Sequence, residues 1–213
     1  EGGFAPQLKS AEEALDLILQ AIDVSGYKAE SQVSICLDCA SSELFDEEKY
    51  LLEGVEKSFN SAEMIGYLET LRSKYPISSI EDGLDEEDWD GWKVLTERLG
   101  SSTQLVGDDI FATNTNRIKK GIKQNVANSV LVKINQIGTI SEVMEAVNLS
   151  KDNGYKTVVS HRSGETEDTS IADIAIGLCS GQIKAGAPSR TDRVAKYNRM
   201  LILEEKFNIP FSS

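Results

Sequence analysis

The stretch V-L-V-K-I-N-Q-I-G-T-I-S-E-V-M-E-A-V-N-L-S-K-D-N-G-Y-K-T-V-V-S, residues 130–160, holds one complete strand–helix–strand unit. Its two short apolar runs, residues 130–132 and 156–159, read as strands, because short uninterrupted apolar runs are typical of strands buried on both faces. Between residues 140 and 147 the apolar positions recur at helical spacing. The stretch therefore predicts two parallel strands joined by a helix.

The same unit recurs along the chain and predicts a parallel sheet. The other expected strands are residues 33–37, 77–80, 104–106 and 182–183. The other expected helices are residues 10–25, 64–75, 89–99, 114–122, 171–178 and 194–202. Six strand–helix units with no composition break or long linker indicate an α/β fold built on one parallel sheet.

Two α/β architectures compete, an open doubly wound sheet and a (β/α) barrel. A dinucleotide-binding sheet would carry G-x-G-x-x-G after its first strand, and the chain has no such motif. Monotonous repetition of the unit favours a barrel, which needs about eight strands to close. We therefore expect a partial barrel of about six βα units.

Length, charge and hydropathy limit the possible functions. The chain has 213 residues, enough for one large domain or two small ones. A net charge of −13 argues against nucleic acid as a partner, because phosphate binding requires clustered Lys and Arg. No apolar run reaches the roughly 18 residues of a membrane span. The first residue is Glu1, not Met, so we expect a piece of a longer protein.

The C-x-x-C motif of Cys36 and Cys39 is compatible with a redox pair or with half of a zinc site. A zinc site requires about four ligands, and only Cys179 and His161 remain to complete one. The motif also flanks a strand end and does not open a helix. Reduced, partly buried thiols of an intracellular protein are the favoured interpretation.

A polar group follows every predicted strand. In chain order these groups are Asp38, Glu81, Asp108, Lys133, the run Ser160-His161-Arg162, and Lys184. In a barrel the carboxyl ends of the strands meet at one rim, where the active sites of this fold lie. We therefore expect one site at that rim, although any single member is also explained as a helix cap, a solvated lysine or a structural histidine.

The residue types indicate the chemistry of this site. Three carboxylates without a histidine or cysteine form an all-oxygen set, which suits Mg²⁺ or Mn²⁺. The adjacent Asp82 and Asp109 could exchange roles with these ligands. The later strands supply two lysines, an arginine and a histidine, and a lysine beside a metal and other cations can act as a base.

Residues 160–169 predict an anion site. We expect Arg162, Ser163 and the N–H groups after Gly164 to bind an anion at a helix N-terminus. His161 lies beside them as a donor to the substrate. Two further arginines, Arg190 and Arg193, are interpreted as surface or helix-start residues.

Taken together, these residues resemble enolase, in order and spacing, from Glu1 to about Glu205. The segments that carry the resemblance are E-G-G-F-A-P (1–6), L-D-C-A-S-S-E (37–43), S-I-E-D (79–82), G-D-D (107–109), L-V-K-I-N-Q-I-G-T (131–139), S-H-R-S-G-E-T-E-D-T (160–169) and G-Q-I-K (181–184). The segments at 131–139 and 160–169 are highly specific, whereas the short acidic pairs alone are not.

The resemblance implies the reversible dehydration of 2-phosphoglycerate to phosphoenolpyruvate in glycolysis and gluconeogenesis, with two Mg²⁺ ions. It implies that Asp38, Glu81 and Asp108 bind the first metal, and that the last two also contact substrate. The remaining implied roles are Lys133 as the base at C2, Lys184 as the partner of the substrate carboxylate, Arg162 and Ser163 as the phosphate site, His161 as their neighbour, and Glu1 as the acid that protonates the departing 3-hydroxyl.

The enolase family also has an N-terminal α+β domain and two further barrel strands that have no counterpart in this sequence. We therefore expect residues 1–213 to be the C-terminal barrel portion, with open sheet edges and weak or no activity alone. As the first residue, Glu1 is not expected to be held in place. The resemblance also implies a cytoplasmic protein, with relatives at the cell surface or secreted, and a homodimeric or larger parent.

Two alternatives remain open. One is another lyase of the enolase superfamily that acts on a different carboxylic acid, such as an acid sugar. Those relatives usually lack an anion site like Ser160-His161-Arg162-Ser163-Gly164. The other is a non-catalytic binding or scaffold role, although the sequence shows no basic stripe or apolar patch that indicates a partner.

Overall fold

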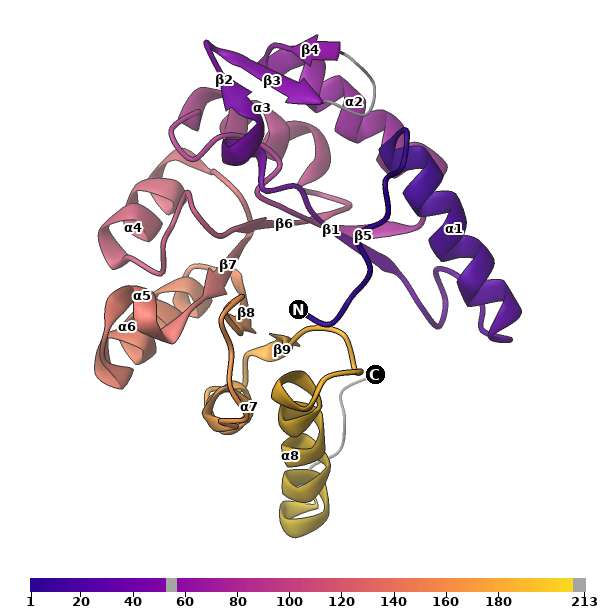
Figure 1. Ribbon diagram of the computed structural model, residues 1–213. Helices are drawn as coiled ribbons and strands as arrows, with labels where there is room; N and C mark the ends of the chain where they lie inside the picture. Colours follow the sequence, from indigo (N-terminus) through magenta and orange to yellow (C-terminus); the bar gives the residue numbers. More distant parts are fainter. Residues whose placement is uncertain (53–56, 209–213) are drawn as a thin grey trace. The chain divides into compact units, whose positions relative to one another are not determined.

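The computed structural model describes residues 1–52 and 57–208 and divides the chain into two compact units (Figure 1). Unit 1 consists of Glu1–Ala5, Phe111–Lys120 and Ser129–Ser213, of which the last five residues are not described. Unit 2 consists of Pro6–Ile110 and Gly121–Asn128. Helix α4 (Thr115–Gln124) has residues in both.

Unit 2 is built on three parallel strands in the order β1-β5-β6. The strands are β1 (Ile35–Asp38), β5 (Ile77–Glu81) and β6 (Gln104–Gly107). The helices of this unit are α1 (Ala11–Val24), α2 (Ser61–Lys74) and α3 (Trp89–Leu99). Each of these strands and helices was expected from its apolar pattern, and all are present.

Local side-chain hydrogen bonds fix the ends of these helices. Asn60 and Glu63 form a capping box at the start of α2, in which each side chain accepts the other's backbone N–H at 2.9 Å. At the start of α3, Asp88 Oδ1 accepts the N–H of Gly91 at 2.9 Å. Helix α2 ends before Pro76, as expected, because proline disfavours helical backbone in the residue that precedes it.

The core of unit 2 is closely packed around Gly83. A Cβ atom at this position would lie 3.1 Å from Leu68 and 3.2 Å from both Ile80 and Leu95. These three side chains are buried, and they belong to α2, β5 and α3. A side chain at residue 83 would therefore force α2, α3 and β5 apart.

Residues 45–52 and 57–59 hold a small antiparallel sheet that was not expected from the sequence. Its strands are β2 (Phe45–Asp46), β3 (Lys49–Leu52) and β4 (Lys57–Phe59), preceded by the short 3-10 helix η1 (Ser41–Leu44). Figure 1 shows it beside α2. Tyr50 is fully buried, and its hydroxyl donates to Asp88 Oδ2 at 3.1 Å and accepts from the N–H of Asp85 at 3.0 Å.

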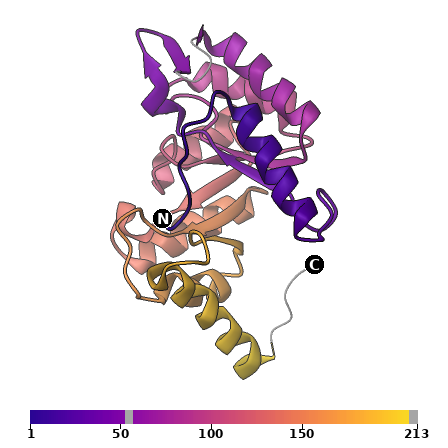
Figure 2. The ribbon, with the colours of Figure 1, turned by 45° about the vertical axis from the view of Figure 1, so that its right-hand side comes forward.

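Unit 1 also contains three parallel strands, in the order β7-β8-β9. The strands are β7 (Ser129–Val132), β8 (Lys156–Ser160) and β9 (Gly181–Lys184). The helices are α5 (Ile134–Ile137), α6 (Ile140–Asp152), α7 (Ser170–Gly177) and α8 (Thr191–Phe207). Figures 1 and 2 both show α7 and α8 side by side.

The strand–helix–strand stretch from β7 to β8 forms as its apolar pattern predicts. All four residues of β7 are buried, as expected for a strand covered on both faces. Helix α6 begins after Thr139, whose Oγ1 accepts the N–H of Glu142 at 3.3 Å, and it buries Val143, Ala146 and Val147. All six expected strands are thus present, and the pairings among them within each unit are parallel, which confirms the α/β class.

Two further expectations concern cysteines and membranes. Cys36 and Cys39 are both free, as expected, but only Cys39 is partly buried, so the expectation of partial burial is wrong for Cys36. Burial and the neighbouring carboxylates Asp38, Asp82 and Glu81 raise the pKa of Cys39 to about 12. Within residues 1–52 and 57–208, no helix combines the length and apolar character needed to cross a membrane.

Asn128 offers a test of this packing in unit 2. Its Oδ1 accepts the N–H of Leu105 at 2.8 Å, and its Nδ2 donates to the carbonyls of Gly100 and Thr103, both at 3.0 Å. Because Asn128→Ala leaves three backbone groups without these partners, we expect it to lower the free energy of unfolding by about 2–4 kcal/mol. Urea unfolding followed by tryptophan fluorescence measures this, since Trp89 and Trp92 both lie on α3 of the same unit.

The control is Asn116→Ala, which changes an exposed asparagine of α4 and should cost less than about 0.5 kcal/mol. An equal loss in both variants would show that the Asn128 side chain does not tie these backbone segments together.

Candidate functional site

The three expected metal ligands lie at the carboxyl ends of the three parallel strands of unit 2. Asp38 and Glu81 are the last residues of β1 and β5 and are opposite one another in the strand register. Asp108 directly follows β6. Asp38 is exposed, and its Oδ1 accepts the N–H of Ala40 at 3.2 Å, whereas Glu81 and Asp108 are each only 7% exposed.

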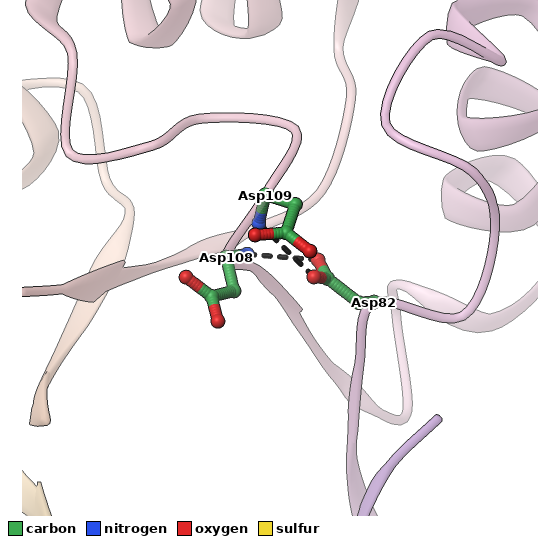
Figure 3. A group of neighbouring side chains, drawn as sticks. All are labelled: Asp82, Asp108 and Asp109. Atoms are coloured by element: carbon green, nitrogen blue, oxygen red, sulfur yellow. Dashed lines mark hydrogen bonds between the residues drawn. The ribbon is translucent and has the colours of Figure 1, made fainter. Parts of the chain in front are cut away.

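Asp82 organises the turn that carries Asp108. Its Oδ1 accepts the N–H of Asp108 at 2.9 Å, and its Oδ2 accepts the N–H of Asp109 at 3.0 Å (Figure 3). Its own backbone is fixed as well, since its N–H donates to the carbonyl of Val106 at 3.0 Å and its carbonyl accepts from Ser41 at 3.1 Å. Asp82 therefore determines where the peptide groups after β6 lie.

Asp82, Asp108 and Asp109 form an acidic cluster. One carboxylate oxygen from each lies within 4.8 Å of the others. Figure 3 shows the carboxylates of Asp82 and Asp109 directed toward one another and the Asp108 side chain pointing away from both. The structure thus brings Asp108 together with the two neighbours that the sequence left as alternative ligands.

The environment of this cluster suits a hard divalent cation. Burial raises the pKa of Asp82 to about 8; the N–H groups of Asp109 and Asp108 oppose this rise, and the carboxylates of the same two residues add to it. Oxygen-only donors with crowded negative charge are the set that Mg²⁺ and Mn²⁺ bind in proteins. Because both oxygens of Asp82 accept backbone N–H groups, this residue is better suited to hold the cluster than to replace Asp108 in it.

In unit 1, Lys133 is held at the end of β7 by a buried threonine that sequence reasoning missed. Lys133 is half-buried, and its N–H donates to Thr113 Oγ1 at 2.9 Å. The same hydroxyl donates to Gln136 Oε1 at 2.9 Å. Thr113 is fully buried, with a left-handed φ of 51°. No pattern in the sequence distinguishes it from other loop threonines.

His161 and Lys184 are neighbours at the ends of β8 and β9. The N–H of His161 donates to the carbonyl of Lys184 at 2.9 Å, and Lys184 is opposite Ser160 in the strand register. The imidazole of His161 is 4% exposed, and its Nε2 lies 3.7 Å from Oε1 of Glu1. The structure therefore brings three expected site residues of unit 1 together.

The first residues of the chain are tied to the loop after β9. The carbonyl of Glu1 accepts the N–H of Ala187 at 3.2 Å, and Ser189 Oγ donates to the carbonyl of Gly2 at 2.7 Å. The backbone of Glu1 is thus held in place, so the expectation that it would not be held is wrong. Its side chain is half exposed, which leaves the carboxyl group accessible.

Arg162 and Ser163 lie on an exposed loop that differs from the expectation. Arg162 Nη1 donates to Asn135 Oδ1 at 3.1 Å. No helix begins after Gly164, because α7 starts only at Ser170. The expected helix start directly after Gly164 is therefore wrong, and Arg162 and Ser163 lie on the loop after β8.

Asp168, between Gly164 and α7, stabilises turns and not a helix start at Gly164. The N–H of Asp168 donates to Thr166 Oγ1 at 3.2 Å, and Asp168 Oδ1 accepts the N–H of Ser170 at 2.8 Å. The hydrogen bonds from Ser170 lower the pKa of Asp168. Side chains of this type bind nearby backbone groups as readily in turns as in helix caps, which explains the error.

Arg193 is a further correction. It was interpreted as a surface or helix-start residue, but its side chain is 0% exposed. Its Nη1 contacts His161 Nδ1 and donates to the carbonyl of Arg162 at 2.8 Å, and its Nη2 donates to the carbonyl of Ser163 at 2.8 Å. Arg190, in contrast, is exposed as expected. Nothing in the sequence separates the two arginines, because burial of a guanidinium depends on partners from a distant loop.

Comparison with known protein families adds to this geometry. A family model described as enolase, C-terminal TIM barrel domain, matches residues 1–209 of the 213. The match covers every described helix and strand. It confirms the resemblance stated from the motifs and the partial-barrel fold class.

The acidic cluster leads to a prediction about metal binding. We expect the chain to bind Mn²⁺, and we expect Asp108→Asn to weaken binding about tenfold or more, because it removes a charged oxygen ligand. Electron paramagnetic resonance of free Mn²⁺ measures the affinity. Asp46→Asn, at an exposed carboxylate of β2, should leave it unchanged, and equal affinities in all three proteins would exclude Asp108 as a ligand.

His161 leads to a prediction about pH. Burial lowers its pKa, Arg193 and Lys184 lower it further, and Glu1 and Glu165 act in the opposite direction. Below about pH 6.5 the unfolded chain binds a proton at this histidine that the folded chain does not bind. The free energy of unfolding should therefore fall as the pH drops below about 6.5, by at most about 1.4 kcal/mol per pH unit from this group.

Urea unfolding of the wild type and of His161→Gln over this pH range isolates the effect, since every carboxylate is common to both proteins. Parallel pH profiles for the two proteins would show that His161 does not stay neutral in the folded state.

Proposed function

The chain belongs to the family of enolase C-terminal TIM barrel domains, and we propose that it carries the active-site residues of a phosphopyruvate hydratase. This activity interconverts 2-phosphoglycerate with phosphoenolpyruvate and water. The observation that carries the proposal is the family match over residues 1–209, together with an ionisable group at the end of each of the six strands that the motifs define. Active sites of barrels of this kind lie at the carboxyl ends of the strands.

Asp38, Glu81 and Asp108 are the proposed metal ligands, and Glu81 and Asp108 also contact the substrate. Their all-oxygen character and the burial of two of them support Mg²⁺, of which the family uses two ions. When bound, Mg²⁺ would stabilise the negative charge that develops on the substrate carboxylate. Asp82 would hold Asp108 in place through the two backbone hydrogen bonds that it accepts.

Proton transfer is assigned to two residues of unit 1. Lys133 would take the proton from C2, and the pair of electrons left behind would form the C2–C3 double bond as the C3–O bond breaks. Glu1 would give a proton to the departing 3-hydroxyl, which leaves as water. The half exposure of Glu1 and the hydrogen bond that fixes its carbonyl support this role, because the acid must be both held and accessible.

The cationic residues bind the rest of the substrate. Arg162 and Ser163 would bind the phosphate, and a guanidinium is well suited to phosphate oxygens. Lys184 would contact the substrate carboxylate and offset its charge, with His161 beside it as a hydrogen-bond donor. A cytoplasmic location and a homodimeric or larger parent follow from the same family resemblance.

The test is phosphoenolpyruvate formation from 2-phosphoglycerate and Mg²⁺ by the purified chain. We expect weak turnover at most, and any turnover should fall about 10³-fold in Lys133→Ala, because a positioned base contributes about 10²–10⁴-fold. Lys123→Ala, at an exposed lysine of α4, is the matched control. Turnover that survives in Lys133→Ala would exclude Lys133 as the base.

If the folded chain shows no turnover, calorimetric binding of phosphoenolpyruvate with Mg²⁺ replaces the rate as the readout. Binding that is lost in Lys184→Ala and retained in Lys123→Ala would support the proposal. No binding by the wild type would contradict it.

A further inference from the structure

We propose that Arg193 is a positioning residue that fixes His161 as the tautomer with its proton on Nε2. The inference deepens the proposed function, because it assigns His161 a defined hydrogen-bonding role. Its test does not depend on activity, since His161 is the only histidine of the chain.

The side chains of Arg193 and His161 are in direct contact. Arg193 lies on α8 and is fully buried, and its Nη1 contacts His161 Nδ1. A guanidinium carries only N–H donors and has no acceptor. Nδ1 must therefore accept, and in a neutral imidazole the proton is then on Nε2.

The proton on Nε2 of His161 points toward Glu1. Nε2 lies 3.7 Å from Oε1 of Glu1, the side chain proposed as the acid. The backbone N–H of His161 donates to the carbonyl of Lys184, which holds the backbone of His161 at the end of β8. With Nδ1 engaged by Arg193, the ring presents a donor on the Glu1 side, where an oxygen of the ligand or of Glu1 can accept it.

Asp192 and Gly186 both lie against the Arg193 side chain. Its Nε lies 3.3 Å from Asp192 Oδ2. Gly186 has a φ of +91°, and a Cβ atom there would lie 2.7 Å from Cδ and 2.9 Å from Cγ of Arg193. Only glycine leaves room for the arginine stem at this position.

The same helix holds the loop after β8 with a second buried cation. Lys196 is also fully buried, one turn after Arg193, and its Nζ donates to the carbonyls of Thr166 and Asp192 and lies 3.4 Å from Glu165 Oε2. Together with the bonds from Arg193 to the carbonyls of Arg162 and Ser163, three carbonyls of the loop accept hydrogen bonds from α8. The loop that carries the proposed phosphate residues is thereby set by α8.

Charge favours the neutral ring. A protonated imidazole would place its Nδ1–H and its positive charge directly against the guanidinium, and burial disfavours a second cation there. Arg193 and Lys184 disfavour the protonated form, and Glu1 and Glu165 favour it; burial is the largest effect and lowers the pKa of His161. Geometry and charge thus agree on a neutral Nε2–H ring.

The first experiment is long-range ¹H–¹⁵N correlation NMR of the uniformly ¹⁵N-labelled chain at neutral pH. With a single histidine, the imidazole signals need no assignment by mutation. We expect one pyrrole-like nitrogen at Nε2 and one pyridine-like nitrogen at Nδ1. An Nδ1–H tautomer, or two protonated nitrogens, would overturn the proposal.

The second experiment compares Arg193→Met with Arg199→Met. Arg199 lies on the same helix and pairs with Asp173 through hydrogen bonds of 2.9 and 2.6 Å, so its loss is matched in charge and size but does not touch His161. We expect a mixture of tautomers or a protonated ring in Arg193→Met, and an unchanged spectrum in Arg199→Met. An unchanged imidazole in a folded Arg193→Met would show that Arg193 does not set the tautomer.

If Arg193→Met does not fold, the wild-type spectrum still decides the tautomer, and Gly186→Ala displaces the guanidinium without deleting it. A mixed tautomer in Gly186→Ala would support the proposal, and a wild-type spectrum would contradict it. A wild type that shows neither 2-phosphoglycerate turnover nor phosphoenolpyruvate binding, but gives the expected spectrum, would remove the proposed function and leave this inference in place.

Discussion

Parallel pairing of the strands is the constraint on which the candidate site depends. Within each unit the carboxyl ends of neighbouring strands lie side by side, so that Asp38 is opposite Glu81 and Ser160 is opposite Lys184. Residues far apart in the sequence become neighbours for this reason alone. Nothing about the carboxylates or the cations would be special in an antiparallel sheet, where consecutive strand ends point in opposite directions.

A second layer of residues converts these rough positions into fixed ones. Asp82, Thr113 and Arg193 each use one polar side chain to bind two or more groups at a neighbouring strand end. The partners are mostly backbone N–H and carbonyl groups of turns and loops, where no helix or sheet supplies a partner. The residues proposed to do chemistry are therefore held by side chains that each make at least two hydrogen bonds.

The sequence predicted the elements that short-range patterns specify. Apolar runs gave all six parallel strands, and the residue after each run gave the candidate carboxylates, lysines and histidine. The small antiparallel sheet β2-β3-β4 was not predicted. Its strands are two to four residues long and contain charged residues, so they show no clear alternation of apolar and polar positions. The apolar pattern predicted a helix at residues 171–178, close to the observed α7, but a helix N-terminus was also expected directly after Gly164. That expectation failed because Asp168 bonds a turn in the way it would bond a helix cap.

The roles of Arg193 and Thr113 could not be predicted from the sequence, because each depends on contacts between distant segments. An arginine in the first turn of a helix looks the same whether it faces solvent or lies beneath a loop.

The close approach of Gly186 to Arg193 also bears on how this fold can vary. A methyl group at residue 186 would occupy the space of the Arg193 stem. A shorter residue at position 193 would leave His161 Nδ1 without its donor. Neither residue 186 nor residue 193 can change alone without a loss of stability, so the two positions are expected to vary together. Among related chains, a residue larger than glycine at position 186 is expected to accompany a replacement of the arginine at position 193. Such chains would then need another hydrogen-bond donor for the histidine.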